Sequence, residues 1–272
     1  MKNNWLIFTD LDGTLLDFDT YDFSDAVPAL RLLKNKGIPV IPCTSKTFSE
    51  VLDLRKRLGI NDPFIVENGS AIFFERNYFK KVHGGGEIEG FPVIVLGKAR
   101  NEILAFFKAL QARFSLNIKG FSEMTISEIQ KHTGLKKAEA ELAQNRMFSE
   151  PMVSFEKNDL SEMDGLLDFI QENGFRLLKG NRFYHLIGRC DKGLATQKLV
   201  QLFEDEYGKT FKTMGLGDSK NDLEMLAAVH QPIIIRKKDG SFVHLNAIDN
   251  VYITNEAGPA GWAEAIYKFV GK

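Results

Sequence analysis

The sequence has few of the features that mark secreted, membrane-bound or nucleic-acid-binding proteins. Its two cysteines, Cys43 and Cys190, are too few for a disulfide framework, and we interpret both as small buried side chains. The formal net charge of -1 excludes the positive field of a general nucleic-acid binder. No apolar run approaches a membrane span, and the N-terminus has one lysine followed by acidic residues instead of a signal peptide. We therefore expect a cytoplasmic protein whose partners are neither membranes nor nucleic acids.

Apolar segments of strand length alternate with helical segments at both ends of the 272-residue chain. Near the N-terminus we predict strands at 6–9, 38–43 and 64–67 and helices at 24–36 and 48–58. Near the C-terminus we predict helices at 193–207, 223–229 and 261–270 and strands at 212–216, 232–236 and 251–254. Such alternation indicates an α/β fold, with a doubly wound parallel sheet as its core.

The middle of the chain lacks this alternation and indicates a separate α+β unit. It begins with a hairpin predicted at 71–74 and 78–82, followed by a glycine cluster, Gly84–Gly86 with Gly90, that is typical of a flexible joint. The later segments are strands at 92–96 and 152–156, helices at 101–114, 127–146 and 160–172, and a hairpin at 175–188 turning at Gly180-Asn181. We therefore predict a core of residues 1–84 and 189–272, with an α+β cap inserted over residues 85–188.

Two aspartates at the end of the first predicted strand are the most informative residues. Asp10 and Asp12 lie two positions apart, so their side chains project to the same side of an extended chain. Like charges this close repel, and a divalent cation between them relieves the repulsion and screens an approaching phosphate. The pattern Asp10-Leu11-Asp12-Gly13-Thr14 therefore indicates phosphate chemistry, although Asp-Gly alone is also common in turns.

Two further segments carry groups suited to phosphate. Thr44-Ser45-Lys46 offers hydroxyls and backbone N–H groups near a helix N-terminus, an arrangement that binds phosphate oxygens or simply caps the helix. Lys192 directly precedes the helix predicted at 193–207, where it either neutralises a phosphate or lies exposed on the surface. Ligands of doubly wound sheets bind at the carboxyl ends of the strands, which is where Thr44 is expected.

A third segment, Gly215–Asp222, follows the strand predicted at 212–216. Asp218 and Asp222 are four residues apart, so they share a face on a helical turn. Their carboxylate oxygens would suit Mg²⁺, which prefers oxygen ligands. The glycines do not form a dinucleotide-binding fingerprint, because Lys220 occupies the position of the third glycine.

Taken in order, these motifs resemble those of the haloacid-dehalogenase-like phosphatases. The resemblance rests on Asp10–Thr14, Thr44, Lys192 and Gly217–Asp222, while Asn68-Gly69 resembles a mark of the branch with a large α/β cap. It implies that Asp10 is the nucleophile that forms an aspartyl-phosphate, and that Asp12 acts as general acid and then as base. It also implies that Thr44 and Lys192 hold the phosphoryl group. The Mg²⁺ ligands that it implies are Asp10, the backbone carbonyl of Asp12, and Asp218, supported by Asn221 and Asp222.

One position departs from the common pattern of that family. Many relatives carry Gly-Arg after the threonine, whereas this chain has Ser45-Lys46. Lysine is a point charge and arginine a two-pronged donor, so the substrate oxygen that Ser45 and Lys46 would meet is left open.

Segments of the predicted cap resemble those of mannosyl-3-phosphoglycerate phosphatases, namely 133–135, 143–151 and 179–185. The substrate of that family carries a phosphate and a carboxylate, so the resemblance implies that Arg146 binds the carboxylate and that Ser149 and Glu150 bind sugar hydroxyls. Arg146 and Glu150 are also four residues apart and could instead form an exposed helical pair. Arg182 and His185 have odd spacing, so at most one should reach the site from a regular strand. His185 could equally be a buried structural histidine.

The resemblance implies a Mg²⁺-dependent phosphomonoesterase acting on mannosyl-3-phosphoglycerate, a small phosphorylated sugar-glycerate. Three alternatives remain: a broad sugar-phosphate phosphatase with the same cap, a phosphomannomutase-type isomerase, and a catalytically silent binding protein. Activity on a panel of substrates distinguishes the broad phosphatase from the specific one. A requirement for a bisphosphate activator would indicate the isomerase. The intact motifs argue against the third.

Overall fold

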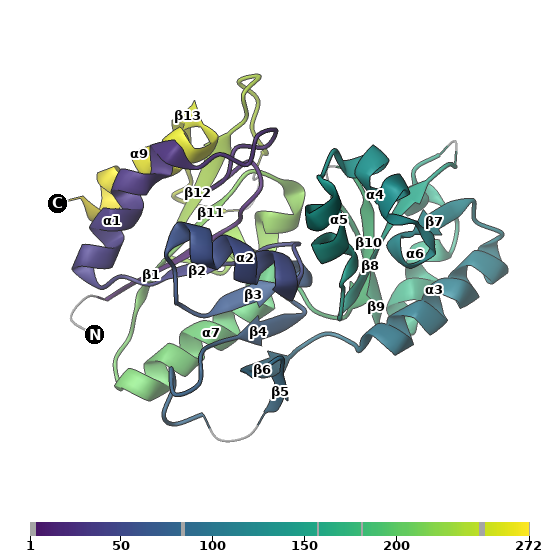
Figure 1. Cartoon of the computed structure of the whole chain (residues 1–272), viewed down its shortest axis with the longest axis horizontal. Coiled ribbons are helices and arrows are strands. Elements are labelled where there is room, and N and C mark those ends of the chain that lie inside the picture. Colours follow the sequence, from purple (N-terminus) through teal and green to yellow (C-terminus); the bar gives the residue numbers. More distant parts are fainter. Residues whose placement is uncertain (1–3, 83–84, 157, 181, 245–247, 272) are drawn as a thin grey trace.

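Two lobes make up the computed structural model, which describes residues 4–82, 85–156, 158–180, 182–244 and 248–271 (Figure 1). The larger lobe contains both ends of the described chain and a five-stranded sheet of order β13-β12-β11-β1-β2. The strands are β1 (Trp5–Thr9), β2 (Val40–Pro42), β11 (Lys212–Gly217), β12 (Gln231–Arg236) and β13 (Tyr252–Ala257), and every pair is parallel. The α/β fold class predicted from the sequence is confirmed.

Apolar residues on both faces of β1 explain why helices cover both sides of this sheet. Ile7 faces one hydrophobic cluster, whereas its neighbours Leu6 and Phe8 face another. The first cluster includes residues of α1 (Val27–Lys36), α2 (Phe48–Leu58) and α9 (Gly258–Val270). The second includes residues of α7 (Lys192–Tyr207) and α8 (Leu223–Ala227). Burying β1 from both sides leaves its carboxyl end as the point where polar side chains can meet.

The segment predicted as a third parallel strand belongs to a different sheet. β3 (Phe64–Val66) pairs antiparallel with β4 (Ala71–Phe73), in a sheet of order β3-β4-β6-β5 with β5 (Gly86–Ile88) and β6 (Phe91–Val95). A single parallel bridge between Cys43 and Ile65 links it to the polypeptide that follows β2.

The strand predicted at 78–82 is wrong, because these residues form bends and irregular backbone. Two backbone N–H groups of this segment, those of Lys80 and Lys81, donate to the Glu206 carboxylate at 2.9 Å. Phe79 packs edge-on against Phe203 of α7, with ring centroids 5.1 Å apart. The segment is therefore held by α7, and β4 pairs with β6 in its place.

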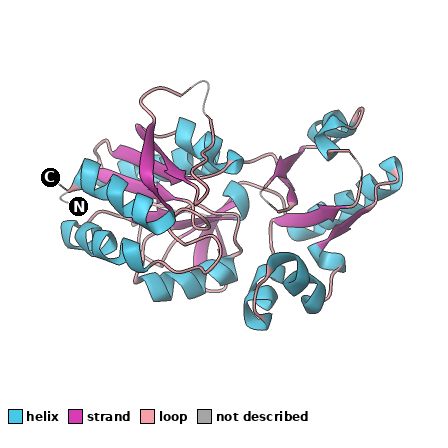
Figure 2. Ribbon diagram, turned by 90° about the horizontal axis from the view of Figure 1, so that it is seen from above, coloured by secondary structure: helices cyan, strands magenta, loops and turns pink. Residues whose placement is uncertain are grey.

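The smaller lobe, which we call the cap, is an antiparallel sheet with helices on both faces (Figure 2). Its strands are β7 (Ile118–Gly120), β8 (Ser149–Ser154), β9 (Phe175–Lys179) and β10 (Tyr184–Gly188), in the order β7-β8-β10-β9. α3 (Arg100–Phe114) and α6 (Leu166–Glu172) pack on one face. The predicted helix 127–146 is two helices, α4 (Ile126–Thr133) and α5 (Lys137–Gln144), because Gly134 ends the first in a left-handed conformation.

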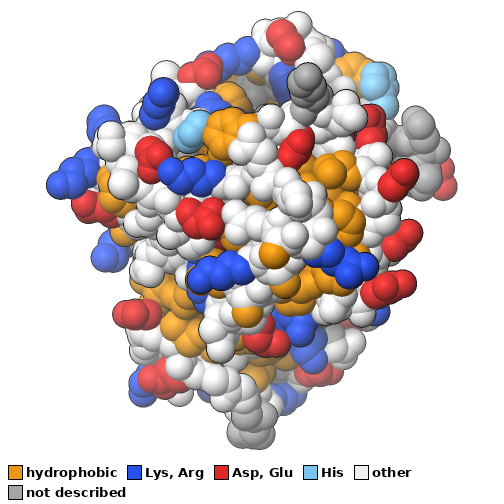
Figure 3. All heavy atoms as spheres, turned by 90° about the vertical axis from the view of Figure 1, so that its right-hand side faces the viewer, with side chains coloured by type: hydrophobic (Ala, Val, Ile, Leu, Met, Phe, Trp, Pro, Cys, Tyr) orange, Lys and Arg blue, Asp and Glu red, His pale blue; other side chains and the backbone are white. Residues whose placement is uncertain are grey.

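Short 3₁₀ turns complete the described elements, at Ser24–Ala26, Glu67–Gly69, Phe121–Glu123, Leu160–Glu162 and Lys220–Asp222. On the outer face of the cap, basic and acidic side chains are intermixed (Figure 3). Among the described residues, no helix combines the length and apolar character needed to cross a membrane.

The chain enters the cap after β6 and leaves it after β10 through two linkers that lie in contact. A Cβ atom on Gly188 would lie 2.7 Å from the backbone nitrogen of Lys98, so only glycine permits this approach. The division into residues 1–84 with 189–272 and residues 85–188 stays a prediction. The pairing of β6 with β4, and of β5 with β6, favours an entry point near Gly97. Of the predicted turn and joint residues, Gly84 and Asn181 lie outside the described residues.

Candidate active site

Asp10 lies at the carboxyl end of β1, an interior strand of the core sheet. Its N–H donates to the Leu216 carbonyl at 2.9 Å, which fixes the residue where β1 and β11 end. Lys192, the first residue of α7, has a fully buried side chain and places Nζ 2.7 Å from Asp10 Oδ1. The Asp191 carboxylate accepts from the Leu194 N–H at 2.7 Å and caps the helix. This cap fixes the start of α7 and thereby the direction of Lys192.

Lys192 also binds Asp222, with Nζ 2.6 Å from Oδ1. The other oxygen of Asp222 accepts from the N–H groups of Asp218 and Ser219, at 3.2 and 3.0 Å. The loop after β11 therefore curves around the Asp222 carboxylate. This curvature places Asp218 near Asp10. Burial lowers the pKa of Lys192, but the Asp10 and Asp222 carboxylates outweigh it and leave that pKa well above its usual value.

Three buried carboxylates, those of Asp10, Asp218 and Asp222, have oxygen atoms within 4.8 Å of one another. Because one lysine does not balance three negative charges, burial and the neighbouring carboxylates raise the pKa of Asp10 despite Lys192. Burial and Asp222 also raise the pKa of Asp218 to about 7. Asp218 Oδ1 is buried without a hydrogen-bond partner among the described residues. A hard divalent cation would satisfy this oxygen and relieve the repulsion, so these residues fit Mg²⁺.

Asp12 projects toward the second predicted phosphate segment. Its Oδ2 lies 2.9 Å from Lys46 Nζ, and Lys46 also lies 3.7 Å from Glu50. The buried Thr44 hydroxyl accepts from the Lys46 N–H at 3.2 Å, which shapes the loop after β2. In this structure the partner of the Lys46 ammonium is therefore the Asp12 carboxylate. The predicted roles of Thr44 and Asp12 toward substrate stay predictions.

A pocket between the two lobes collects most of the predicted substrate residues. Its lining includes Asp10, Asp12, Ser45, Lys46 and Asn221 from the core, and Arg146, Arg182 and His185 from the cap. Asn221 Nδ2 donates to Asn68 Oδ1 at 3.1 Å, so the Asn68-Gly69 turn supports the loop that follows β11. The structure thus joins motifs separated by up to two hundred residues in one cavity.

Arg182 and His185 both line this pocket, so the expectation that at most one would reach it is wrong. β10 begins at Tyr184, and Arg182 lies in the loop before it, where strand alternation does not apply. Burial lowers the pKa of His185 to about 3, with Arg146 adding to the effect, so its ring is neutral near pH 7. Its Nδ1 is buried and has no hydrogen-bond partner within the described part of the chain.

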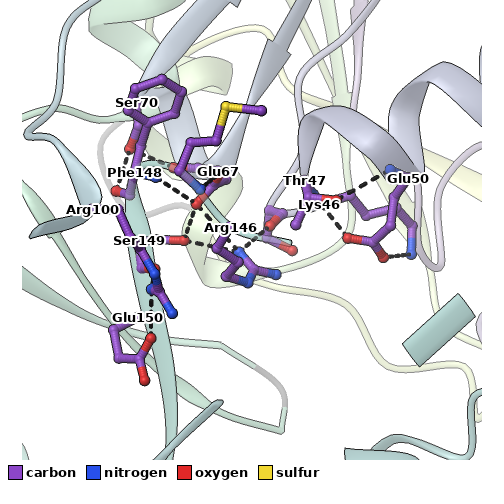
Figure 4. Close-up of polar contacts among 12 residues, drawn as sticks. Lys46, Thr47, Glu50, Glu67, Ser70, Arg100, Arg146, Phe148, Ser149 and Glu150 are labelled. Atoms are coloured by element: carbon purple, nitrogen blue, oxygen red, sulfur yellow. Dashed lines mark hydrogen bonds and ion pairs between the residues drawn. The ribbon is translucent and has the colours of Figure 1, made fainter. Parts of the chain in front are cut away.

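Glu150 does not reach the pocket. In β8 it pairs with Leu186, and both belong to the face that α3 covers, whereas Pro151 pairs with the pocket residue His185. Glu150 is fully buried, with Oε1 accepting from the Ser122 hydroxyl at 2.6 Å and Oε2 2.5 Å from Arg100. Figure 4 shows it pointing toward Arg100 and away from Arg146. The exposed helical pair of Arg146 and Glu150 is also wrong, because both side chains are buried and β8 begins at Ser149.

Glu67 is a residue of this site that the sequence reasoning missed. It follows β3 directly, is fully buried, and accepts hydrogen bonds from the cap segment that carries Arg146 and Ser149 (Figure 4). The available signal was an acidic residue between an apolar strand and the Asn68-Gly69 turn. A carboxylate placed there must find a partner once the strand is buried.

Comparison with known proteins places this geometry in a family. The model of the haloacid dehalogenase-like hydrolases matches residues 7–256, and the chain belongs to that family. The family resemblance inferred from the motifs is therefore confirmed.

Two curated relatives are similar over almost the whole chain. Both are named glucosyl-3-phosphoglycerate/mannosyl-3-phosphoglycerate phosphatase. The protein of Persephonella marina is 40% identical over 268 residues, covering 98% of this chain and 97% of the relative. That of Methanococcoides burtonii is 36% identical over 271 residues, again covering 98% and 97%. A solved haloacid dehalogenase-like hydrolase from B. subtilis has the same fold, with a TM-score of 0.67 at 19% identity over 97% of this chain and 99% of that one.

Proposed function

We propose that the protein is a Mg²⁺-dependent phosphomonoesterase that hydrolyses mannosyl-3-phosphoglycerate and glucosyl-3-phosphoglycerate to phosphate and the glycosylglycerate. The observation that carries the proposal is the buried ammonium of Lys192 between Asp10 and Asp222, because Asp10 also lines the pocket to which the cap contributes two arginines. The names of two relatives that match nearly the full chain support the choice of substrate.

The proposed reaction has two displacements at phosphorus. In the first, an Asp10 carboxylate oxygen forms a bond to phosphorus while the ester P–O bond breaks, and Asp12 gives a proton to the departing alkoxide. In the second, water attacks the aspartyl-phosphate, Asp12 takes the proton from that water, and Asp10 is released with inorganic phosphate. Thr44 and Lys192 hold phosphoryl oxygens during both steps.

A carboxylate attacks a phosphate dianion only where positive charge offsets the repulsion. One unit charge at about 4 Å is worth roughly 4 kcal/mol in a moderately screened site, and Lys192 supplies one such charge. We propose that Asp10, Asp218 and the Asp12 carbonyl would hold Mg²⁺, with Asn221 and Asp222 in support. The bound ion would supply the remaining positive charge near the phosphoryl oxygens.

The cap residues are proposed to recognise the remainder of the substrate. All polar contacts of the Arg146 guanidinium with the described residues run through Nη1, and its Nε is buried without a hydrogen-bond partner among them. Because Arg146 lines the pocket, we propose that the glycerate carboxylate becomes the missing partner of the edge formed by Nε and Nη2, in a two-pronged contact. Arg182 and His185 line the same pocket and are proposed to contact the sugar.

The test is phosphate release from mannosyl-3-phosphoglycerate, glucosyl-3-phosphoglycerate and mannose 6-phosphate, each with Mg²⁺ and with EDTA. We expect Mg²⁺-dependent turnover that is much more efficient with the two glycerates, and none in Asp10→Asn. Equal efficiency on all three substrates would favour a broad sugar-phosphate phosphatase. A requirement for a bisphosphate activator would favour an isomerase.

A further inference from the structure

The carboxylate of Glu67 is a core group whose hydrogen bonds go to the cap. It accepts from the N–H groups of Met147 and Phe148, at 2.9 and 3.1 Å, and from the Ser149 hydroxyl at 2.5 Å. The residue has no exposed surface. A buried carboxylate is costly unless such donors surround it, so these contacts determine where the segment 146–149 lies against the core.

The backbone that presents Glu67 is strained and tied to the catalytic loops. Glu67 and Asn68 have φ values of +48° and +59°, a region that non-glycine residues rarely occupy because it is strained. Their N–H groups donate to the carbonyls of Lys46 and Thr44, at 3.0 and 2.9 Å. The turn therefore places Glu67 relative to the predicted phosphate-binding loop after β2.

Arg146 is connected to Glu67 through one hydroxyl. Its Nη1 donates to Ser149 Oγ at 2.9 Å, and Ser149 in turn donates to Glu67, while Nη1 itself lies 3.8 Å from the Glu67 carboxylate. Nη1 also donates to the Ser45 carbonyl at 3.0 Å. Figure 4 shows Glu67, Ser149 and Arg146 grouped at the junction of the two lobes. Because Nη1 is fixed by these acceptors, the plane of the guanidinium is fixed, and so is the direction in which its Nε and Nη2 atoms point.

We propose that Glu67 is a positioning residue that sets the specificity of the pocket for substrates carrying a carboxylate beside the phosphate. It acts through Ser149 and Arg146, by fixing the guanidinium at a set place relative to Asp10. This inference rests on the proposed function. If the function is as proposed, the selectivity for carboxylate-bearing substrates depends on the core residue Glu67, which does not line the pocket itself.

The experiment compares kcat/KM for mannosyl-3-phosphoglycerate with kcat/KM for mannose 6-phosphate, which lacks the carboxylate. We expect Glu67→Gln to lower this ratio about tenfold, equivalent to ~1.4 kcal/mol, because one amide oxygen cannot replace two carboxylate oxygens. The loss should appear as a raised KM for the glycerate substrate, with kcat for mannose 6-phosphate nearly unchanged. Glu67→Asp, which keeps the charge but has a shorter reach, should also lower the ratio.

A double-variant cycle separates positioning from general damage to the fold. Because Glu67 acts through Arg146, the double variant Glu67→Gln/Arg146→Ala should have the same ratio as Arg146→Ala alone. Asp62→Asn is the matched control: it alters a carboxylate that accepts from the Val40 N–H and the Tyr78 hydroxyl, both at 2.9 Å, away from the pocket lining, and should leave the ratio unchanged. If Glu67→Gln does not fold, Ser149→Ala carries the same cycle.

Three results would overturn the inference while leaving the proposed function intact. These are an equal loss on both substrates in Glu67→Gln, an unchanged or raised ratio, and additive effects in the double variant. If the wild-type protein itself shows no preference for the glycerate substrate, the proposed function fails first. The wild-type ratio therefore distinguishes the two failures.

Discussion

Replacing Lys192 with methionine removes the ammonium from the centre of the site and keeps an unbranched apolar stem. The side chain is fully buried, and its two partners, Asp10 and Asp222, lie at 2.7 and 2.6 Å. Losing one partner of a buried ion pair costs about 3–5 kcal/mol, because the remaining charge is left uncompensated. We expect the free energy of unfolding in EDTA to fall by about that amount in Lys192→Met.

The same substitution removes one positive charge from the phosphoryl site. A unit charge at about 4 Å contributes roughly 4 kcal/mol at moderate screening, which corresponds to about a thousandfold in kcat. Added Mg²⁺ should recover more stability in Lys192→Met than in the wild type, because the carboxylates then bind the ion without a competing ammonium. Urea denaturation with EDTA or Mg²⁺, and phosphate release at saturating substrate, measure these effects.

Lys198→Met is the matched control, because Lys198 lies exposed on the same helix. It should change the free energy of unfolding by no more than about 0.5 kcal/mol and leave kcat unchanged. The reasoning is refuted if Lys192→Met keeps both wild-type stability and wild-type kcat. It is also refuted if Mg²⁺ stabilises that variant no more than the wild type.

Three further substitutions test other features of the site. The pKa of His185 is lowered to about 3 by burial, so below pH 6.5 the unfolded chain binds a proton at this residue that the folded protein does not; from pH 6.5 to 4.5 the wild type should lose about 2 kcal/mol of stability relative to His185→Gln, whose denaturation at both pH values supplies the reference. A Cβ on Gly69 would lie 2.1 Å from the Asp191 carbonyl, so Gly69→Ala should cost about 2–4 kcal/mol; Gly59→Ala, with nothing within 4 Å, should cost about 1 kcal/mol, and similar costs would contradict the clash. Asp218→Asn should abolish the rise in melting temperature that Mg²⁺ gives the wild type, and a retained rise would exclude Asp218 as a ligand.

The core and its motifs could be predicted from the sequence because their signals are local. An apolar strand that ends in Asp10 and Asp12 fixes both the side on which these residues lie and the edge of the sheet that they reach. Strand parity was not applied to Glu150, because the strand was predicted at 152–156, whereas β8 begins at Ser149 and includes this residue. Glu150 was therefore assigned to the pocket although it faces α3.

Contacts between the lobes could not be predicted, because they join residues that no local pattern connects. Glu67 and Met147 lie far apart in sequence, and their contact depends on how the inserted cap docks on the core. The segment at 78–82 contains Tyr78, Phe79 and Val82, residue types that are enriched in strands. It was misjudged because Glu206 of a distant helix binds its backbone N–H groups.

The place of β1 in the sheet also bears on how the chain folds. Its register with β11 pairs Trp5 with Lys212, so the strand that carries the nucleophile acquires this neighbour only across a loop of about 200 residues. In the chain-entropy model, closing such a loop costs about 5 kcal/mol, and the cap accounts for only about 0.5 kcal/mol of it, because the cost grows with the logarithm of length. Linkers that enter and leave side by side thus let the catalytic sheet carry an insertion of almost any size at little thermodynamic cost. On the ribosome, however, the nucleophile strand must wait for most of the protein to be synthesised before its site can close.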